Sequence, residues 1–592
     1  MNIEKLIETS GQLLWSRLSF KKHDIKLIKS IIDLLSYRLT WAKYDLDHVP
    51  TGAIAPQFMS ARKAIEMIHD NATVISTGIG GNSRCSILYW AVRDRYLTQK
   101  HPAGLTWITV AGVGGRGKAP GTIEEIGVKG LVACHIAGHM ETHKSLLQLA
   151  DDGDLELHVL PQGVTAFLLE ALGRGEKSMV SRVGLGTFLD PRTGRGSAVT
   201  SPARNTYVRA GGDETLEYTL PNIDVAAFSA PYADAEGNIY FKHAATITEN
   251  RDAAIAAKRN NGKVIVEVSG IIEKSPSEIA IASSMVDAIV VNPRSTQTGG
   301  ALQRKYMPMF TEGAKTDVVD GMRLLKLTNI ITGITPHRGP MQDAMSRMAA
   351  SLFVEEAQKG AIINLGIGLP EEVGRLLFES GIYKDLISTT ESGVYGGVPT
   401  PGIYFGAAIN PQKIMSSAEM FHLYEEKLDI TVLGFLQVDS DGSVNVSRRG
   451  PKMMNYVGPG GFPNMVSYAK TIIFIGNWME GANYSISGGK VKMIKGGIPK
   501  FVERVDEVTM NGKIAAREGK KVYYVTSVGI FQLTEKGLEL IQVMPGIDIE
   551  RDILRSCQAK IIVPKGGDIP IVGQALLTGQ GFALALRGEA LT

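Results

Sequence analysis

Glu391 is the residue whose type and surroundings most directly suggest chemistry. It lies near the start of TTESGVYGGVPTPGIYFG, a stretch rich in glycine and proline that runs from Thr389 to Gly406. The preceding residues 385–390 read as a short buried strand, and the glycines that follow let backbone approach closely. In open α/β sheets the ligand crevice lies outside the carboxyl ends of the strands. We therefore expect the Glu391 carboxylate to face a concave surface, where it suits chemistry better than packing.

A second glycine-rich segment, GVGGRG at 112–117, has the spacing of a dinucleotide-binding loop. Pro120 and Gly121 interrupt the helix whose N-terminus would carry the pyrophosphate, so NAD binding is not expected. The segment continued to Lys118 nearly forms a phosphate-binding P-loop. Ala119, however, stands where a Ser or Thr must coordinate magnesium, which argues against an ATP-dependent mechanism. Backbone amides of the loop can still receive a phosphate group.

Potential metal ligands gather in CHIAGHMETH, residues 134–143. Three histidines recur there at the i, i+4 spacing of a helix. Gly138 weakens such a helix, and no clear downstream carboxylate or cysteine completes a site. Ordinary packing and hydrogen bonding are the favoured interpretation, with a metal site as the alternative. The residues concerned are Cys134, His135, His139, Glu141 and His143.

The elements that must position these residues follow an α/β pattern. From about residue 56 helical and strand patterns alternate, as in 61–69 followed by 73–77, which favours βαβ units and a mostly parallel sheet. The pattern occurs twice. The run TVISTGIG at 73–80 matches AIINLGIG at 361–368, and an aspartate with a glycine thirteen residues later occurs at both Asp224 and Asp429.

These matches predict two homologous open α/β domains, at 56–292 and 341–592, joined by a linker at 293–340 that is rich in glycine and proline. A helix with one apolar face, ended by Gly360, opens the second copy. Residues 1–55 read as a helical extension with one apolar stripe, which packs on the first domain or on another subunit; a membrane-surface role is the less favoured reading. The apolar face of the helix before Gly360 consists of Met345, Met348, Ala349, Leu352 and Phe353.

Composition is that of an ordinary globular protein. The 592 residues exceed the roughly 250 to 300 that one core supports. Lys and Arg total 63 against 60 Asp and Glu, so neither nucleic acid nor an anionic membrane is expected as a partner. The three cysteines are too few for a disulfide framework, and we find neither a secretory signal nor an apolar run of about 18 residues. A cytoplasmic enzyme is the resulting prediction.

The stretch around Glu391 resembles the nucleophile segment of the family I CoA-transferases, in particular their acetate and propionate CoA-transferase branch. The resemblance covers roughly residues 55 to 560 in the order of the family. It is carried by ESG at 391–393, GGVP at 396–399 and FG at 405–406, and by GLGTFLDPR at 184–192, YADAEGNI at 232–239, NLGIGLP at 364–370, GSVNVSRRGP at 442–451, GPGGF at 458–462 and PGID at 545–548.

The resemblance implies two fused NagB/RpiA-like CoA-transferase domains, the second carrying the nucleophile. It implies that Glu391 attacks a short-chain acyl-CoA to form an anhydride and then a glutamyl-CoA thioester, from which a carboxylate acceptor recovers CoA in a ping-pong cycle. No metal and no cofactor other than the substrate CoA is then required. It also implies a homo-oligomer, a dimer or a tetramer, in short-chain fatty acid metabolism.

Site residues can be assigned on the same resemblance. Gly460 and Gly461 are expected to supply oxyanion-stabilising or CoA-contacting amides, although a turn that needs positive φ also explains these glycines. The segment around Asn445 is expected to line the cleft, and the loop at 112–117 to receive a phosphate or pantetheine group. His139, in the Ala-Gly-His that the family carries, is expected to be structural or to face the substrate. The remaining predicted contacts are Gly458, Asn364, Gly366, Gly368, Gly396 and Gly397.

One departure and two alternatives accompany this assignment. Many relatives carry Gln where this chain has Val113, so acyl specificity is not transferred from them. An acyl-CoA hydrolase on the same scaffold would need water to reach the anhydride or the glutamyl-CoA. A binding protein without catalysis is the more distant alternative, and the presence of Glu391 between glycine segments argues against it.

Overall fold

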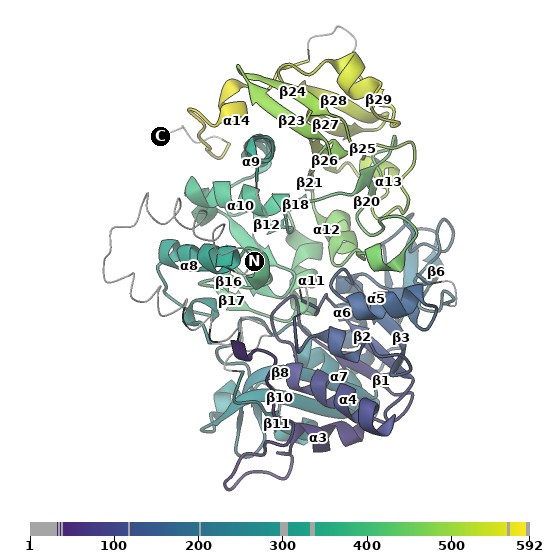
Figure 1. Cartoon of the computed structure of the whole chain (residues 1–592), viewed down its shortest axis with the longest axis vertical. Coiled ribbons are helices and arrows are strands. Elements are labelled where there is room, and N and C mark those ends of the chain that lie inside the picture. Colours follow the sequence, from purple (N-terminus) through teal and green to yellow (C-terminus); the bar gives the residue numbers. More distant parts are fainter. Residues whose placement is uncertain are drawn as a thin grey trace.

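The computed structural model contains two large sheets, one in each half of the chain (Figure 1). It describes residues 39–115, 119–200, 203–295, 306–331, 338–564 and 569–587, together with residues 32 and 36. Most of the predicted N-terminal extension therefore lies outside the described residues. No helix among the described residues is long and apolar enough to cross a membrane.

The first sheet has the strand order β11-β10-β8-β1-β2-β3-β4, all parallel, with β9 added antiparallel to β8. It confirms the parallel α/β architecture expected from the alternating pattern. Helices α4 (Ser86–Gln99), α5 (Lys144–Asp151), α6 (Gln162–Arg174) and α7 (Asn250–Arg259) connect its strands. The strands are β1 (Thr73–Ser76), β2 (Leu105–Thr109), β3 (Val132–Ala137), β4 (Glu156–Val159), β8 (Val225–Asp234), β9 (Ile239–Tyr240), β10 (Lys263–Ile272) and β11 (Ala288–Val291).

The second sheet is larger and mixed, in the order β17-β14-β13-β12-β18-β21-β26-β27-β28-β29. Its centre, from β13 to β26, is parallel. Helices α9 (Pro340–Glu356), α10 (Leu369–Glu379), α11 (Ser417–Lys427) and α12 (Phe462–Tyr468) belong to this half. The strands are β12 (Ile362–Leu365), β13 (Ile387–Thr390), β14 (Val394–Tyr395), β17 (Lys413–Ile414), β18 (Ile430–Leu433), β21 (Thr471–Ile475), β26 (Lys521–Val525), β27 (Gly529–Thr534), β28 (Gly537–Val543) and β29 (Ile561–Ile562).

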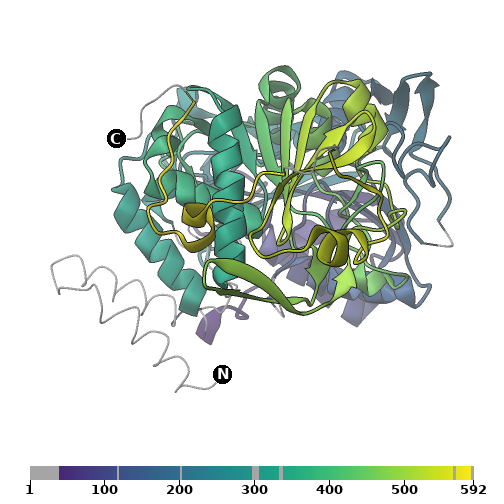
Figure 2. The ribbon, with the colours of Figure 1, turned by 90° about the horizontal axis from the view of Figure 1, so that it is seen from above.

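Helix α9 is the helix predicted to open the second copy. Its predicted apolar face is buried, but it ends at Glu356, four residues before Gly360, which instead makes the positive-φ turn into β12. Arg347 on α9 donates hydrogen bonds to the carbonyls of Leu576 and Leu577, at 2.6 and 2.8 Å. The yellow C-terminal segment accordingly lies beside α9 when the molecule is seen from above (Figure 2).

The central strand pairs show that the fold is duplicated. In the first half the Asp224 carboxylate accepts a hydrogen bond from the Thr73 amide at 2.8 Å; in the second, Asp429 accepts one from the Ile362 amide at 2.9 Å. Each aspartate directly precedes the strand that pairs with the first strand of its half. The structure therefore equates Thr73 with Ile362, whereas the sequence match equates Thr73 with Ala361. The one-residue difference arises because the sheet register follows the aspartate and its bonded amide, not the glycines after the strand.

The second predicted match corresponds to a repeated turn. Asp234 and Asp439 each accept two backbone amides, from the second and fourth residues that follow them. Gly237 and Gly442 occupy the third position at φ of 89° and 75°, which favours glycine.

The region between the halves contains regular structure of its own. Helix α8 (Val318–Ile331) lies within the predicted linker, and Met322 and Leu325 on it join a small core with Tyr404 and Ile409 of the second half. The predicted domain boundaries stay a prediction. The halves also meet through α6, α11 and α12 near the middle of Figure 1, where the ring of Phe167 stacks on that of His422 at 4.3 Å.

Candidate active site

Glu391 follows β13 directly, so it lies at the carboxyl end of a central parallel strand, as predicted. The Thr389 hydroxyl fixes the strand by donating to the Ile363 carbonyl of β12 at 2.7 Å. Gly393 then turns the chain at φ 97°, and an added Cβ there would lie 1.9 Å from the Met415 carbonyl oxygen. The turn after the carboxylate therefore requires glycine.

The Glu391 carboxyl has an unusual electrostatic environment. The residue is half-buried, and burial raises the pKa of its carboxyl from 4.5 to about 7. Among the described residues none makes a hydrogen bond or an ion pair with this carboxylate. An ionised carboxylate that no cation or donor stabilises is more nucleophilic than a paired one, so the environment suits covalent catalysis.

Gly461 lies directly against this carboxylate. A Cβ added to Gly461 would be 2.5 Å from Glu391 Oε2 and 3.3 Å from the Phe421 ring. The backbone of Gly461 has φ −81° and ψ −5°, so the close approach, and not a positive φ, is the reason for glycine. The predicted role of the Gly461 amide stays a prediction, and Gly461 is the residue of the 458–461 loop that lies against Glu391.

Gly460 and Gly458 are held differently. The Gly460 amide donates to the Gly138 carbonyl at 2.9 Å, and the Gly460 carbonyl accepts from the Gln162 amide at 3.0 Å. The Gly458 amide approaches the Ser447 carbonyl at 3.3 Å. The Gly460 amide is thus engaged across the two halves in this structure and is not free to stabilise an oxyanion, which corrects that part of the prediction.

The first half completes the site with loops that follow its strands. Gly138 and His139 come after β3, and Gln162 begins α6 after β4. A Cβ added to Gly112, in the loop after β2, would lie 2.7 Å from His139 Cδ2. Burial lowers the pKa of His139, which keeps its ring neutral. His139 therefore lies between two glycine loops, Gly112 on one side and Gly460 on the other.

Asn364 contacts Tyr424, a residue near Glu391 that could not be identified from the sequence. Its Nδ2 donates to the Tyr424 hydroxyl at 3.1 Å, and Tyr424 is buried close enough to Glu391 for the two charges to interact. Asn464 was missed as well; its Oδ1 accepts from the Gly163 amide of the first half at 3.1 Å. A single sequence offers no signal for either contact, because both join segments at least 60 residues apart.

The other predicted glycines have local roles. Gly368 precedes α10 at φ 95°, and Gly396 and Gly397 form a positive-φ turn before β15 (Val398–Pro399). A Cβ at Gly396 would meet the Gln412 side chain at 2.6 Å, and one at Gly397 the Ile409 carbonyl at 2.5 Å.

The amide of Asn445 is fully used in its own turn. It donates to Gln437 and to the Arg448 carbonyl, and it accepts from the amides of Ser447 and Arg448. The Asn445 side chain therefore shapes the backbone at 445–448 and has no group left for a ligand.

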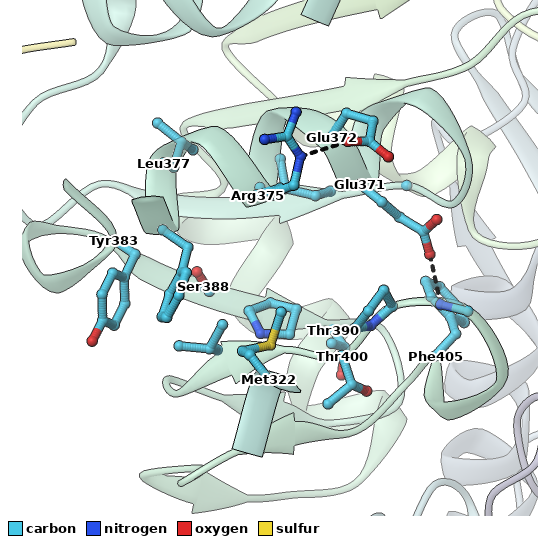
Figure 3. Close-up of a pocket in the computed structure, with 18 of the residues that line it drawn as sticks. Met322, Glu371, Glu372, Arg375, Leu377, Tyr383, Ser388, Thr390, Thr400 and Phe405 are labelled. Atoms are coloured by element: carbon cyan, nitrogen blue, oxygen red, sulfur yellow. Dashed lines mark hydrogen bonds and ion pairs between the residues drawn. The ribbon is translucent and has the colours of Figure 1, made fainter. Parts of the chain in front are cut away.

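Gly366 lines a cavity of about 260 Å³ beside β13 (Figure 3). Ser388 and Thr390 of β13 face it, and most of its wall is apolar. At its rim Glu371 accepts a hydrogen bond from the Gly402 amide at 3.0 Å, and Arg375 donates to Glu372 at 2.7 Å. The cavity adjoins the strand that Glu391 follows.

The segment 134–143 is not a helix. Residues Val132–Ala137 form β3, and α5 begins only at Lys144. His135 bonds to the Trp107 carbonyl at 2.9 Å and to His143 at 3.1 Å, and His143 in turn accepts the Val113 amide at 3.1 Å. These two histidines are thus hydrogen-bonded within the fold, as expected. The i, i+4 spacing has no helical meaning here, because His135 lies in a strand and His139 and His143 lie in the loop that follows it.

The Val113 side chain is fully buried in the core of the first half. Because it packs inward, the Val113 side chain adds no apolar wall to the site. The described residues do not favour NAD binding by the 112–117 segment. A short 3₁₀ turn, Ile123–Ile126, follows it where a dinucleotide-binding loop requires a helix.

Sequence comparison finds similarity to proteins that share one activity in their names. Residues 58–292 match the family model described as Coenzyme A transferase. The caffeate CoA-transferase of Acetobacterium woodii is 32% identical over 518 residues, which cover 84% of this chain and 93% of that protein. The acetate CoA-transferase YdiF of Escherichia coli (strain K12) is 32% identical over 506 residues, which cover 84% of this chain and 91% of YdiF.

Structural comparison agrees. The apoenzyme of the acyl-CoA transferase YdiF from Escherichia coli O157:H7 superposes with a TM-score of 0.79 at 27% identity, covering 91% of this chain and all of that one. A second structure of the same protein, a thioester complex with CoA, superposes with a TM-score of 0.78. The match extends over both halves of the chain.

Proposed function

The chain belongs to the coenzyme A transferase family and is an acyl-CoA:carboxylate CoA-transferase, and we propose that it works through a glutamyl-CoA thioester on Glu391. The observation that carries this proposal is the placement of the Glu391 carboxylate against Gly461, where loops of both halves meet. A solved relative has been captured as a thioester complex with CoA, which supports a covalent route.

The proposed cycle begins with attack by Glu391. One carboxylate oxygen bonds to the acyl carbonyl carbon, the C–S bond breaks, and CoA leaves as a thiolate. The thiolate then attacks the Glu391 carbonyl of the anhydride, so that the acyl group departs as a free carboxylate and glutamyl-CoA remains. The acceptor acid repeats both steps in reverse and takes CoA away. Each attack creates an oxyanion, and the Gly461 amide is the candidate donor nearest to it.

Protonation controls the first step. A carboxyl with a pKa of about 7 ionises at neutral pH, yet it is more basic than an ordinary glutamate and therefore a stronger nucleophile. His139 is held neutral by burial, and no proton has to be transferred in the cycle. The proposed route thus needs neither a general base nor a cofactor.

We propose short-chain acids such as acetate or propionate as the carboxylate partners. Overall identity does not select them, because two relatives with equal identity are named for acetate and for the much larger caffeate. Transfer rates to acetate, propionate and caffeate from one CoA donor test this point. A kcat/KM for caffeate above that for both short acids would overturn it.

The covalent route is tested by intact-protein mass spectrometry after brief incubation with acetyl-CoA or propionyl-CoA. We expect an adduct of the mass of CoA less water on the peptide that carries Glu391, and its removal when a carboxylate acceptor is added. The Glu391→Gln variant should form no adduct. Transfer activity without any adduct across several donors would contradict the route.

Hydrolysis is the alternative on the same scaffold. It requires water to reach the anhydride or the glutamyl-CoA, and the half-buried position of Glu391 among packed loops disfavours that access. Release of free CoA in the absence of acceptor, at a rate equal to transfer in its presence, would favour a hydrolase. We also propose a cytoplasmic homo-oligomer, for which light scattering of the purified protein is the first test.

A further inference from the structure

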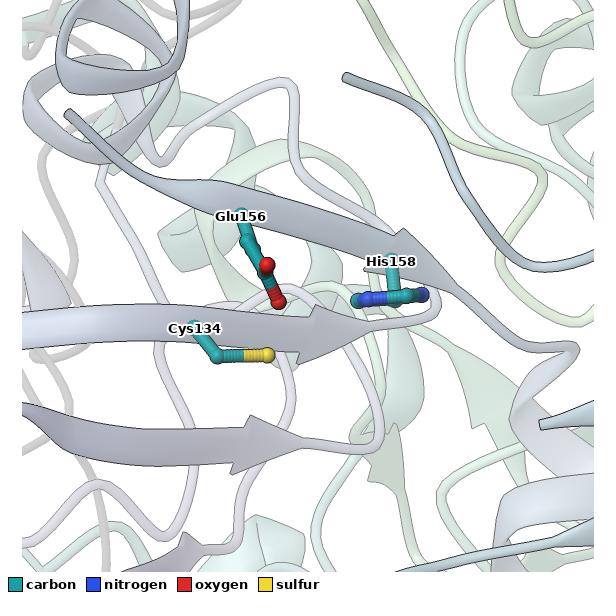
Figure 4. Close-up of side chains that lie close together, drawn as sticks. All are labelled: Cys134, Glu156 and His158. Atoms are coloured by element: carbon teal, nitrogen blue, oxygen red, sulfur yellow. The ribbon is translucent and has the colours of Figure 1, made fainter. Parts of the chain in front are cut away.

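A cysteine, a glutamate and a histidine converge on the last two strands of the first sheet, away from Glu391. Cys134 on β3 lies directly opposite Glu156 on β4, and His158 follows two residues later on β4. Because side chains two apart on a strand share a face, all three project from the same side of the sheet (Figure 4). Their nearest ligand atoms, Sγ, a carboxylate oxygen and a ring nitrogen, all lie within 4.8 Å of one another.

The histidine is held in the tautomer that a metal requires. The Ser197 hydroxyl donates to Asn205 Oδ1 at 3.2 Å, so its oxygen is left to accept from His158 Nδ1, which lies 3.2 Å away. Asn205 cannot turn over, because its Nδ2 donates to the Val208 carbonyl at 2.6 Å. With the proton on Nδ1, the lone pair of Nε2 is available to a ligand.

The charges also suit a divalent cation. Arg195 is a cation whose charge acts on His158. Arg195 itself is paired with Glu507 at 2.8 Å and bonded to the Tyr456 hydroxyl. One thiolate and one carboxylate would balance two positive charges.

We propose that Cys134, Glu156 and His158 form a zinc site that fastens β4, the edge strand of the first sheet, to β3. Thiolate, imidazole and carboxylate are the ligands that Zn²⁺ takes in proteins, whereas Mg²⁺ and Ca²⁺ take oxygen ligands alone. Glu156 is exposed, and a water molecule from that side completes a tetrahedral set. On binding, the S–H bond of Cys134 breaks, a S–Zn bond forms and the proton leaves to solvent.

The site is separate from the transfer chemistry. The sequence of the 134–143 segment shows no clear downstream carboxylate that completes a site, because the partners of Cys134 lie 22 and 24 residues away and come near only through the parallel register of β3 and β4. The neighbouring His135 takes no part, since it is satisfied by Trp107 and His143.

Titration of the chelator-treated full-length protein with Zn²⁺, in competition with a coloured zinc indicator, tests the proposal. We expect one equivalent to bind, and Co²⁺ in its place to show the charge-transfer absorption of a thiolate ligand. Cys134→Ser should abolish that absorption, and Glu156→Gln or His158→Gln should weaken zinc binding at least about 100-fold. Ser197→Ala removes the hydroxyl that holds the proton on His158 Nδ1, and it should weaken zinc binding about 10-fold.

Cys557→Ser is the matched control, because Cys557 is a free cysteine outside the cluster, and it should bind zinc as the unaltered protein does. Circular dichroism of each metal-free variant shows whether it folds; Glu156 is exposed, so Glu156→Gln is expected to fold in any case. Absence of the thiolate absorption, or equal zinc affinity in Cys134→Ser, Glu156→Gln and the unaltered protein, would overturn the proposal.

Discussion

The ends of β2 and β13 are equivalent positions in the two halves, but they carry different residues in different environments. Thr73 pairs with Thr106 as Ile362 pairs with Ile387, so the register that equates Thr73 with Ile362 also equates Val110 with Glu391. Val110 is 1% exposed and belongs to the first core. Glu391 is half-buried at the site, with a carboxyl pKa of about 7.

This difference shows that the fold does not decide which half reacts. Both strand ends lead into glycine-rich segments, and each has a close contact within its own half: Gly112 lies against His139, and Gly461 lies against Glu391. The halves meet beside them, where the Gly460 amide donates to the Gly138 carbonyl. One half carries Glu391, and the other holds the glycine loop next to it. The side chain at this equivalent strand end is a core valine in one half and a half-buried carboxylate in the other.

Removal of the carboxylate should give the largest effect. Glu391→Gln keeps the volume of the side chain and should lower transfer by about 10⁴-fold or more, because no nucleophile remains. An acyl-CoA:acetate exchange assay measures the loss, and circular dichroism checks the fold. Retention of a tenth of the activity would show that the two strand ends are less different than the comparison states.

A side chain added beside Glu391 should give the second largest loss of transfer activity. Gly461→Ala is allowed by its backbone angles, yet it places a Cβ 2.5 Å from Glu391 Oε2. We expect kcat/KM to fall about 100-fold, because the added Cβ displaces the carboxylate, with the thermal midpoint nearly unchanged. Gly270→Ala in the first half is the control, since an added Cβ there meets nothing within 4 Å. Equal activity of the two variants would contradict the assignment of Gly461.

The pH dependence tests the electrostatic side of the comparison. Because the nucleophile must be ionised, kcat/KM should fall about tenfold for each pH unit below about 7. An acid limb with an apparent pKa near 4.5 would show that burial does not act on Glu391 as described.

Stability should change with pH in the opposite sense. The pKa of Glu391 is raised on folding, so the stability that its neutral carboxyl provides is complete below pH 4.5 and is lost as the pH rises to about 7. Glu391→Gln should therefore increase the free energy of unfolding at pH 8 by up to about 3 kcal/mol, and not at pH 4. Denaturant titrations at both pH values measure the difference.

Glu249→Gln is the matched control for that measurement. Glu249 is fully buried, and burial likewise raises its pKa to about 7. This variant should be stabilised at pH 8 in the same way and should retain transfer activity. Stabilisation of neither variant would mean that the raised pKa values do not describe the folded protein.

The smallest effect is expected on the wall opposite the nucleophile. Gly112→Ala would place a Cβ 2.7 Å from His139 Cδ2 and displace that ring. Because His139 contacts the glycine loop and not Glu391 itself, we expect a loss of only about tenfold in kcat/KM. A loss as large as that of Gly461→Ala would indicate that the first half takes part more directly.

Sequence reasoning predicts those features of this molecule that depend on local pattern. The alternating elements and the two Asp–Gly spacings indicate the duplicated parallel fold, and the strand before Glu391 indicates its position at a sheet end. Contacts across the halves could not be predicted, because their partners are hundreds of residues apart. Gly460 and Gly138 show this well: a glycine that reads as an oxyanion donor has its amide committed to a carbonyl more than 300 residues earlier. The one-residue shift between glycine motif and sheet register has a similar cause, since a side chain after one strand fixes the amide of another.

The hydrogen bonds that join Gly460 to Gly138 and to Gln162 have a consequence for the newly made chain. They tie the loop beside the nucleophile to the first half, so the reactive arrangement exists only after the halves have docked. A chain whose halves have not docked lacks these two bonds, and the glycine loop then keeps only contacts within the second half, such as that of the Gly458 amide with Ser447. Docking of the halves is therefore a step in building the site as well as the fold.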